Sequence, residues 1–400
     1  MTSDDYDVII VGGGPAGATL GYELCRRDVR TLLLERATFP RYKPCAGGIQ
    51  FKVTKLIPFD ITPLVETTVH DLVFTYKLGA EFTRHSDEPL VYTVDRGKFD
   101  ALLLQKAKEQ GLDVREEHKV KDVKQEDGRV IADTDRGSYE AKVLVGADGA
   151  DGVVAHASGL MKETRTDIGL QSEISVEAGE LARFKNKICI DWGTIPSGYG
   201  WVFPKKDHLS VGISGPAALG TRLRSYLQLF TEHQGLDSAA VIKTRGHKLP
   251  TRKPGVPIVK GRVALVGDSA GLLDPFTGEG IFYAIKSAQL AANTISRALS
   301  TDNISEELIQ YQEAVDGELM PELIAAQTLM ETANCIPRVI HKWVRDNDRF
   351  WQALCRIVRG ERTYTDIIRK AGRLGWVWPV LDARGTSIEQ RRISKLKKNS

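Results

Sequence analysis

The stretch VIIVGGGPAGATL, residues 8–20, decides the fold. Four β-branched residues lead into a GxGxxG pattern, and a helical pattern follows it directly. Gly12 allows the tight turn, Gly14 lets the backbone approach a pyrophosphate, and Gly17 permits close packing of helix on strand. The stretch therefore predicts a dinucleotide-binding βαβ unit with the pyrophosphate at the helix N-terminus. The residues predicted to contact the cofactor are Gly12, Gly14, Pro15, Ala16 and Gly17.

A second short strand, residues 31–35, ends in an acid. Glu35 is placed to accept hydrogen bonds from ribose hydroxyls, and Arg36 follows it as a further predicted contact. The carboxylate would repel a 2′-phosphate. The βαβ signature alone leaves FAD and NAD open as the nucleotide.

The composition excludes several classes of protein. The chain has 400 residues, 42% of them hydrophobic, which is enough for two or three lobes. Its 55 Lys and Arg against 52 Asp and Glu leave a net charge of +3, so nucleic acid is not an expected partner. The five cysteines are widely spaced without a CxxC pair, and the eight histidines show no ligand spacing, so we expect neither disulfides nor a metal. This cysteine usage favours a cytoplasmic protein.

Strand-like and helical segments alternate along the chain. Residues 60–95 and 169–214 read as antiparallel strands, whereas 97–110 and 281–299 read as helices. We predict an α/β fold in which a Rossmann-type nucleotide domain is interleaved with an α+β substrate domain carrying an antiparallel sheet. The predicted domains are a nucleotide domain (1–60, 95–160 and 255–300), a sheet domain (61–94 and 161–254), and a helical C-terminal region with a basic tail (301–400).

Two later motifs bear on the choice of nucleotide. VLVGADGADG (143–152) and VALVGDSAGLLDPFTGEGI (263–281) each end a strand in a glycine-rich acidic turn. Together with GxGxxG they resemble the FAD-dependent aromatic hydroxylase-like superfamily, whose FAD domain is of the glutathione reductase type. The resemblance covers roughly residues 6–300 and implies FAD as cofactor, with Asp268 on the ribityl chain. The other contacts that it implies are Arg96, Val120, Asp148, Gly149, Gly280 and Ile281.

Two further stretches narrow the family. RYKPCAGG (41–48) and PSGYGWVFP (196–204) resemble the geranylgeranyl reductase family, in its prokaryotic and archaeal branch. That family usually has PCGGG or RCGEG, so Ala46 is a mild departure that should preserve a tight backbone. The family's YxWxFP element is matched by Tyr199, Trp201, Phe203 and Pro204, predicted to bind substrate. The WxWxIP pattern of tryptophan halogenases is not seen, which disfavours chlorination.

The aromatic residues of this element have their own physical interpretation. Tyr199, Trp201 and Phe203 occupy alternate positions of a strand, so they project from one face. Such a wall suits an isoprenoid chain. The alternative is that these rings are ordinary core.

Cys45 is the predicted catalytic residue. The glycines after it should bend the loop across the flavin, and the resemblance places Cys45, Ala46 and Gly48 among the cofactor contacts. Saturating an alkene needs a hydride and a proton, and a thiol that is mostly protonated near neutral pH can supply the proton. The aromatic wall would stabilise positive charge that develops on the carbon. The alternative is a small cysteine that only packs.

The resemblance implies an oxidoreductase acting on CH–CH groups that saturates a geranylgeranyl or other isoprenoid chain of a prenyl lipid, prenyl diphosphate or prenylated quinone. The electron donor stays open among NADPH, NADH and ferredoxin, so an electron-donor protein is one possible partner. The alternatives are an aromatic-ring monooxygenase using NAD(P)H and O2, and a noncatalytic lipid carrier.

No apolar run reaches the roughly 18 residues that span a bilayer. The C-terminal region, aromatic at 341–360 and basic at 384–400, suits peripheral contact with the inner face of the membrane, or alternatively a packed helix and a solvated tail.

Overall fold

The chain folds into two units that are interleaved along the sequence. A computed structural model describes residues 6–162 and 164–370. The first unit comprises residues 1–43, 96–165 and 249–323, and the second comprises 44–95, 166–248 and 324–400. Residues 44–60, assigned to the nucleotide domain from sequence, group with the second unit because β3 (Gly48–Gln50) pairs with β7 (Val91–Val94). Residues 301–323 group with the first unit rather than with the C-terminal region.

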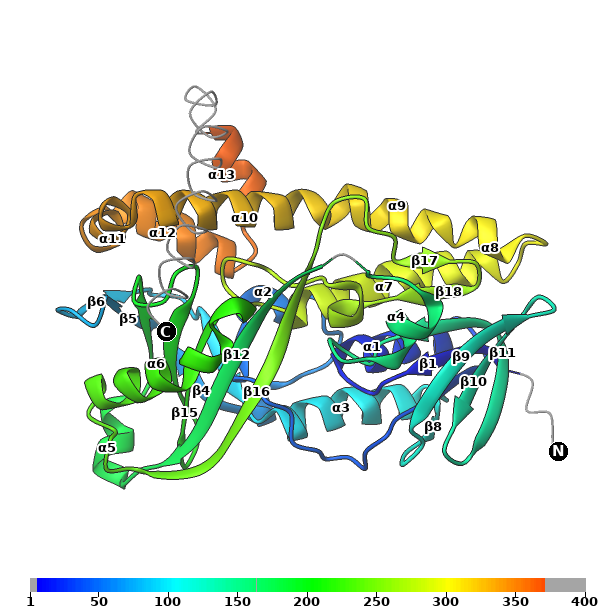
Figure 1. Ribbon diagram of the computed structural model, residues 1–400, viewed down its shortest axis with the longest axis horizontal. Coiled ribbons are helices and arrows are strands. Elements are labelled where there is room, and N and C mark those ends of the chain that lie inside the picture. Colours follow the sequence, from blue (N-terminus) through cyan, green and yellow to red (C-terminus); the bar gives the residue numbers. More distant parts are fainter. Residues whose placement is uncertain (1–5, 163, 371–400) are drawn as a thin grey trace. The chain divides into compact units, whose positions relative to one another are not determined.

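The first unit is built on an eight-stranded sheet (Figure 1). Its main path runs β17-β18-β11-β1-β2-β8, and all neighbours from β18 to β8 are parallel. β9 and β10 continue from β11 as an antiparallel ribbon. The strands are β1 (Tyr6–Val11), β2 (Thr31–Leu34), β8 (Asp113–Arg115), β9 (Val120–Glu126), β10 (Arg129–Thr134), β11 (Gly137–Gly146), β17 (Val259–Lys260) and β18 (Val263–Leu265).

Helices complete the first unit. α1 packs against α3 and α7, and α7 packs in turn against α8 and α9. Tyr311 of α9 is fully buried and donates its hydroxyl hydrogen to the carbonyl of Leu265 at 2.8 Å. The helices are α1 (Pro15–Cys25), α3 (Arg96–Glu109), α4 (Val153–Ser158), η3 (Gly267–Ala270), α7 (Ile281–Ala298), α8 (Ile304–Glu307) and α9 (Ile309–Glu318).

The second unit contains a seven-stranded sheet in the order β16-β12-β15-β14-β13-β5-β6 and a three-stranded sheet in the order β3-β7-β4. The pairs β12–β15, β15–β14, β14–β13 and β5–β6 are antiparallel, whereas β13 and β5 run parallel. The remaining strands are β4 (Val65–Val69), β5 (Asp71–Tyr76), β6 (Phe82–His85), β12 (Thr164–Ser175), β13 (Lys187–Trp192), β14 (Tyr199–Pro204), β15 (Leu209–Pro216) and β16 (Ala240–Arg252).

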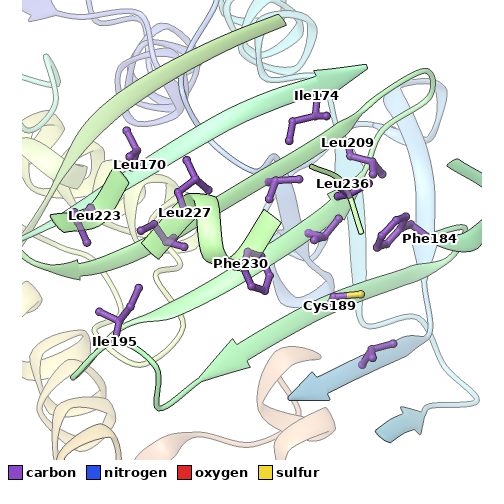
Figure 2. Close-up of a cluster of buried hydrophobic side chains, with 14 of the residues drawn as sticks. Leu170, Ile174, Phe184, Cys189, Ile195, Leu209, Leu223, Leu227, Phe230 and Leu236 are labelled. Atoms are coloured by element: carbon purple, nitrogen blue, oxygen red, sulfur yellow. The ribbon is translucent and has the colours of Figure 1, made fainter. Parts of the chain in front are cut away.

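One face of the seven-stranded sheet is filled by α6. Figure 2 shows Leu223, Leu227 and Phe230 of this helix against strand residues that include Leu170 and Leu209. The periodicity of α6 buries these three residues at spacings of four and three. The other helices are α2 (Phe51–Thr54), η1 (Thr62–Leu64), α5 (Ala178–Arg183), η2 (Ala217–Leu219), α6 (Gly220–His233), α10 (Met320–Cys335), α11 (Pro337–Asp346), α12 (Asp348–Val358) and α13 (Tyr364–Lys370).

The predicted fold class is confirmed: a parallel sheet flanked by helices and a largely antiparallel sheet are built from alternating segments of one chain. The predicted helix at 97–110 is α3, which begins one residue earlier. The predicted helix at 281–299 is α7. In the part of the chain that the structure describes, no helix is both long and apolar enough to cross a bilayer.

Candidate active site

The glycine turn between β1 and α1 has the shape that a pyrophosphate needs. Gly12 has φ +105°, and a Cβ there would lie 2.5 Å from the carbonyl oxygen of Ala147. A Cβ at Gly17 would overlap the carbonyl of Gly12, so the helix can start only where this residue has no side chain. Gly14 differs, because its nearest neighbour is Arg41 Nη2 at 3.7 Å. Packing therefore requires glycine at Gly12 and Gly17, whereas Gly14 leaves open space in front of α1.

The side chain of Glu35, the residue directly after β2, is hydrogen-bonded to this turn. It is buried and accepts hydrogen bonds from the backbone N–H of Gly13 at 2.8 Å and of Ala37 at 3.0 Å. Carboxylate oxygens carry more lone pairs than these two bonds use, so Glu35 can still accept from ribose hydroxyls. Arg36 is exposed to solvent.

Two arginines share one buried acid in the first unit. Arg96, at the start of α3, donates to Asp100 at 2.9 and 3.0 Å, and Arg41 donates to the same carboxylate at 3.3 Å. Arg41 Nε also lies 4.0 Å from Glu35 Oε2, so two guanidinium groups meet two carboxylates. A guanidinium has five N–H donors in a planar fork, which suits a phosphate-bearing cofactor. Arg41 was not among the contacts predicted from sequence. Its partner Asp100 lies too far along the chain to be recognised from spacing.

The second and third motifs meet at Ser269. Its hydroxyl accepts from the N–H of Gly149 at 2.7 Å and donates to Asp148 at 3.0 Å. Asp148 also accepts from the N–H of Val154 at 3.0 Å, and its burial raises the pKa of this carboxyl. The predicted residues Asp148 and Gly149 are thus held by the GDSAG turn, and Ser269 is a partner that sequence reasoning missed.

Asp268 lies beside the N-terminus of α7. Its Oδ1 would be 3.2 Å from a Cβ at Gly280, the residue that caps the helix without a side chain. The structure therefore places Asp268 beside Gly280, with Ile281 as the next residue of the chain. An N-terminus of this kind favours negative charge nearby. Val120, also predicted as a contact, is buried as the first residue of β9.

These features fit FAD. Gly12 and Gly17 let the turn close tightly on neighbouring backbone, and Gly14 leaves room in front of α1. Glu35 and Asp268 offer acceptors for the ribose and the ribityl chain. Among the residues that the structure describes, no three His, Cys, Asp or Glu side chains form a metal site.

The thiols of the chain differ in their surroundings. Burial raises the pKa of Cys25 to about 11, of Cys189 to about 12 and of Cys355 to about 11, which keeps these thiols protonated as packing groups. Cys45 is only partly buried, and its Sγ accepts from the N–H of Gly47 at 3.4 Å. It is therefore the better placed of these four for chemistry.

The Cys45 loop lies against the aromatic strand β14 within the second unit. Gly47 has φ +72°, and its carbonyl accepts from the N–H of Val94 at 2.9 Å. A Cβ at Gly48 would lie 2.5 Å from the ring of Phe203. The glycine pair thus lets the thiol-bearing backbone approach the aromatic face closely. Ala46 is partly buried in the same loop.

The three aromatic residues of β14 share the face opposite α6. A Cβ at Gly200, between them, would be 3.1 Å from Phe230 of α6, so the alternate positions point the other way. The rings of Tyr199 and Trp201 have centroids 5.6 Å apart. Trp201 is 8% exposed, and its Nε1 has no hydrogen-bond partner among the described residues. Part of the wall is therefore enclosed rather than open. Pro204, the last residue of β14, is buried and projects to the α6 side, two positions beyond Val202 of that core.

The wall continues onto strands that sequence reasoning did not connect with it. Register places Trp192 of β13 opposite Tyr199, and Tyr76 of β5 beside Trp192. The rings of Tyr76 and Trp192 are 5.9 Å apart, and Trp192 Nε1 donates to His341 Nδ1 of α11 at 3.2 Å. This face is thus an aromatic surface drawn from distant parts of the chain.

Comparisons with known proteins agree with these features. The family model described as "FAD binding domain" matches residues 5–191. An uncharacterized protein of Methanosarcina barkeri is 31% identical over 78% of this chain and 80% of its own length. The digeranylgeranylglycerophospholipid reductase of Methanococcus vannielii is 26% identical over 78% of this chain and 82% of its own length.

Solved structures share the fold. A geranylgeranyl bacteriochlorophyll reductase-like protein of Thermoplasma acidophilum superposes with a TM-score of 0.74 at 25% identity, covering 82% of this chain and 87% of that one. The flavin-dependent brominase Bmp2 superposes with a TM-score of 0.73 at 20% identity, covering 89% and 94%. The second likeness concerns the fold alone.

Proposed function

Because the chain belongs to the geranylgeranyl reductase family of FAD-dependent oxidoreductases, we propose that it saturates carbon–carbon double bonds of an isoprenoid chain. The observation that carries this proposal is the contact between the Cys45 loop and the aromatic face, where Gly48 lies against Phe203. A loop that carries a thiol and packs against a row of aromatic rings is suited to an apolar substrate that must receive a proton.

The chemistry divides between the cofactor and the side chains. Reduced FAD supplies a hydride to one carbon of the double bond. Cys45 supplies the proton to the other carbon: the S–H bond breaks, a C–H bond forms, and a thiolate remains. The rings of Tyr199, Trp201 and Phe203 stabilise positive charge that develops on the more substituted carbon, because their faces attract cations.

The cofactor is held by the first unit in this proposal. Gly12, Gly14 and Gly17 receive the pyrophosphate at the start of α1, and Glu35 accepts from the ribose. Asp268 binds the ribityl chain, beside the N-terminus of α7. Arg41 and Arg96 add N–H donors for the phosphates.

The substrate class includes prenyl lipids, prenyl diphosphates and prenylated quinones. A curated relative is named for reduction of digeranylgeranylglycerophospholipid, and this supports a membrane-derived prenyl lipid as the first compound to test. Mass spectrometry of lipids that copurify with the protein would identify the substrate directly.

The decisive experiment replaces Cys45 by Ser and by Ala in the FAD-loaded protein. With dithionite as reductant and a geranylgeranyl lipid as substrate, we expect the saturated product, measured by mass spectrometry, to fall at least about hundredfold while FAD stays bound. Cys25→Ser is the matched control, because this thiol is partly buried on α1 of the first unit and should not affect turnover. The proposal would be refuted if Cys45→Ala formed as much product as the parent. Oxygen-dependent NADPH consumption that is equal in the parent and in the Cys45 variants would also refute it and would favour a hydroxylase.

We also propose that the C-terminal helices contact the inner face of the membrane. On α11, Trp343 is 46% exposed and Val339 is 42% exposed, and the neighbouring Arg338 and Lys342 are exposed as well. Apolar and basic side chains on one helix suit the headgroup region of an anionic bilayer. The basic stretch 384–400 lies outside the described residues.

Vesicle sedimentation tests this contact. The protein should sediment with vesicles containing about one third phosphatidylserine and stay in solution with pure phosphatidylcholine. The variants Trp343→Ser and Lys342→Gln should each weaken sedimentation several-fold, whereas Lys206→Gln, an exposed cation of the sheet, should not. Equal binding to neutral and anionic vesicles would contradict the proposal.

A further inference from the structure

Lys205 is a buried lysine beside the Cys45 loop. It follows β14 directly, and it is only 7% exposed. Its Nζ donates to the carbonyl oxygen of Val94 at 2.7 Å. A Cβ at Gly47 would overlap this same Nζ. The amine is therefore in direct contact with the backbone two residues beyond Cys45.

The contacts form a short chain from the amine to the thiol. Lys205 touches Gly47, and the N–H of Gly47 donates to Cys45 Sγ at 3.4 Å. Gly47 is also fixed by the N–H of Val94, so Val94 binds the loop and the lysine at once. Burial of an amine is unfavourable unless the amine is hydrogen-bonded or paired with opposite charge, and the carbonyl of Val94 supplies one such bond to Lys205.

Charged groups surround the amine on each element packed against it. Burial lowers the pKa of Lys205, and four groups oppose that shift: Glu66 of β4, Cys45, Glu173 of β12 and Asp95 after β7. The lowered pKa means that the buried ammonium gives up a proton more readily than a solvated lysine does. The Cys45 thiol is thus among the groups that interact electrostatically with Lys205.

We propose that Lys205 positions the Cys45 loop and that its ammonium stabilises the Cys45 thiolate left after each reduction. The thiolate then takes a proton from water: an O–H bond of water breaks, the S–H bond of Cys45 re-forms, and hydroxide is left in the solvent. No oxidant or reductant is consumed in this step. The inference rests on the proposed function, since only an enzyme that protonates its substrate from Cys45 needs the thiol restored.

The test compares Lys205→Met with Lys206→Met, the exposed neighbour. In the FAD-loaded protein, the rate at which iodoacetamide alkylates Cys45 is followed by peptide mass spectrometry across a range of pH. Without the ammonium the thiolate is less favoured, so we expect alkylation of Lys205→Met near neutral pH to slow roughly three- to tenfold, and its dependence on pH to move to higher pH. Lys205→Arg should keep the charge and stay within about twofold of the parent.

Turnover provides a second readout. For reduction of a geranylgeranyl lipid, kcat of Lys205→Met should fall about tenfold at neutral pH with KM nearly unchanged, because the proton rather than the substrate is affected. If Lys205→Met is unstable, Lys205→Gln keeps a donor for Val94 without the charge and gives the same comparison.

The outcomes separate the two proposals. Alkylation of Cys45 that is identical in Lys205→Met and Lys206→Met at each pH would overturn the role of Lys205. Absence of prenyl reduction in the parent protein would instead overturn the proposed function, and the alkylation experiment would still report how the charge of Lys205 affects the Cys45 thiol.

Discussion

Replacing Gly17 and Gly14 by alanine should separate folding of the first unit from binding of its cofactor. A Cβ at Gly17 would overlap the carbonyl oxygen of Gly12 and lie 3.1 Å from the carbonyl carbon. Both atoms belong to backbone, so no side chain can rotate away and α1 must move from β1. Overpacking of this kind costs about 1–3 kcal/mol or more. That loss is a large part of the roughly 5–15 kcal/mol by which a domain is stable.

Gly14 should behave in the opposite way. A Cβ there meets Arg41 at 3.7 Å, an ordinary contact, and its φ of −71° suits any residue. We expect Gly14→Ala to change the free energy of unfolding by less than about 0.5 kcal/mol. The new methyl group occupies the space in front of the helix, so the Kd for FAD should rise at least tenfold, or about 1.4 kcal/mol.

Urea unfolding followed by circular dichroism and titration of the apoprotein with FAD measure the two quantities. Gly317→Ala is the control, because this glycine lies inside α9 with no described atom within 4 Å of a new Cβ. It should stabilise the protein by up to about 1 kcal/mol and leave the Kd for FAD unchanged. If Gly17→Ala unfolds at the parent's urea midpoint, or Gly14→Ala binds FAD like the parent, the reasoning about the turn is wrong.

Two other changes test the packing of each unit. Tyr311→Phe removes the hydroxyl that bonds to the buried carbonyl of Leu265, and should lower the free energy of unfolding by about 1–2 kcal/mol in urea titrations without affecting FAD binding. In the second unit, a hydrogen bond with Glu173, 3.2 Å away, raises the pKa of His208. A raised pKa contributes stability that is fully present below the usual imidazole pKa and is lost as pH rises through the folded-state pKa. The Tm of the parent should therefore fall more between about pH 6 and pH 8 than that of His208→Gln, and parallel Tm curves would show that the pair is not formed.

The sequence predicted the first unit well, because its signals are local. GxGxxG reports on a turn whose glycines touch neighbouring backbone, and Gly12 and Gly17 meet such contacts in the structure. The pairing of Asp268 with Gly280 could be expected because both lie in one short motif. Ser269 was missed as a partner of Asp148, since nothing in either motif shows which side chain spans them.

The second unit was harder to predict from sequence, because its site is formed by residues that are far apart along the chain. A strand with alternating aromatic residues shows which side chains share a face, but the register with β13 and β5 adds Trp192 and Tyr76 to that face. His341 reaches it from a helix near the other end of the chain. Lys205 was not singled out from the sequence, because two lysines and an aspartate after a strand normally mark a solvent-exposed turn.

The packing of the Cys45 loop explains why two glycines follow Ala46. Gly47 has a positive φ, and a Cβ there would overlap both the carbonyl oxygen of Val94 and Lys205 Nζ. Gly48 must be small because the ring of Phe203 lies against it. The loop therefore packs between the amine of Lys205 and the ring of Phe203. Each contact restricts the conformations of the loop that carries the Cys45 thiol. Under the proposed function both contacts have a use: the ring would make the surface beside the loop apolar, and the cation would stabilise the thiolate that remains once Cys45 has given up its proton.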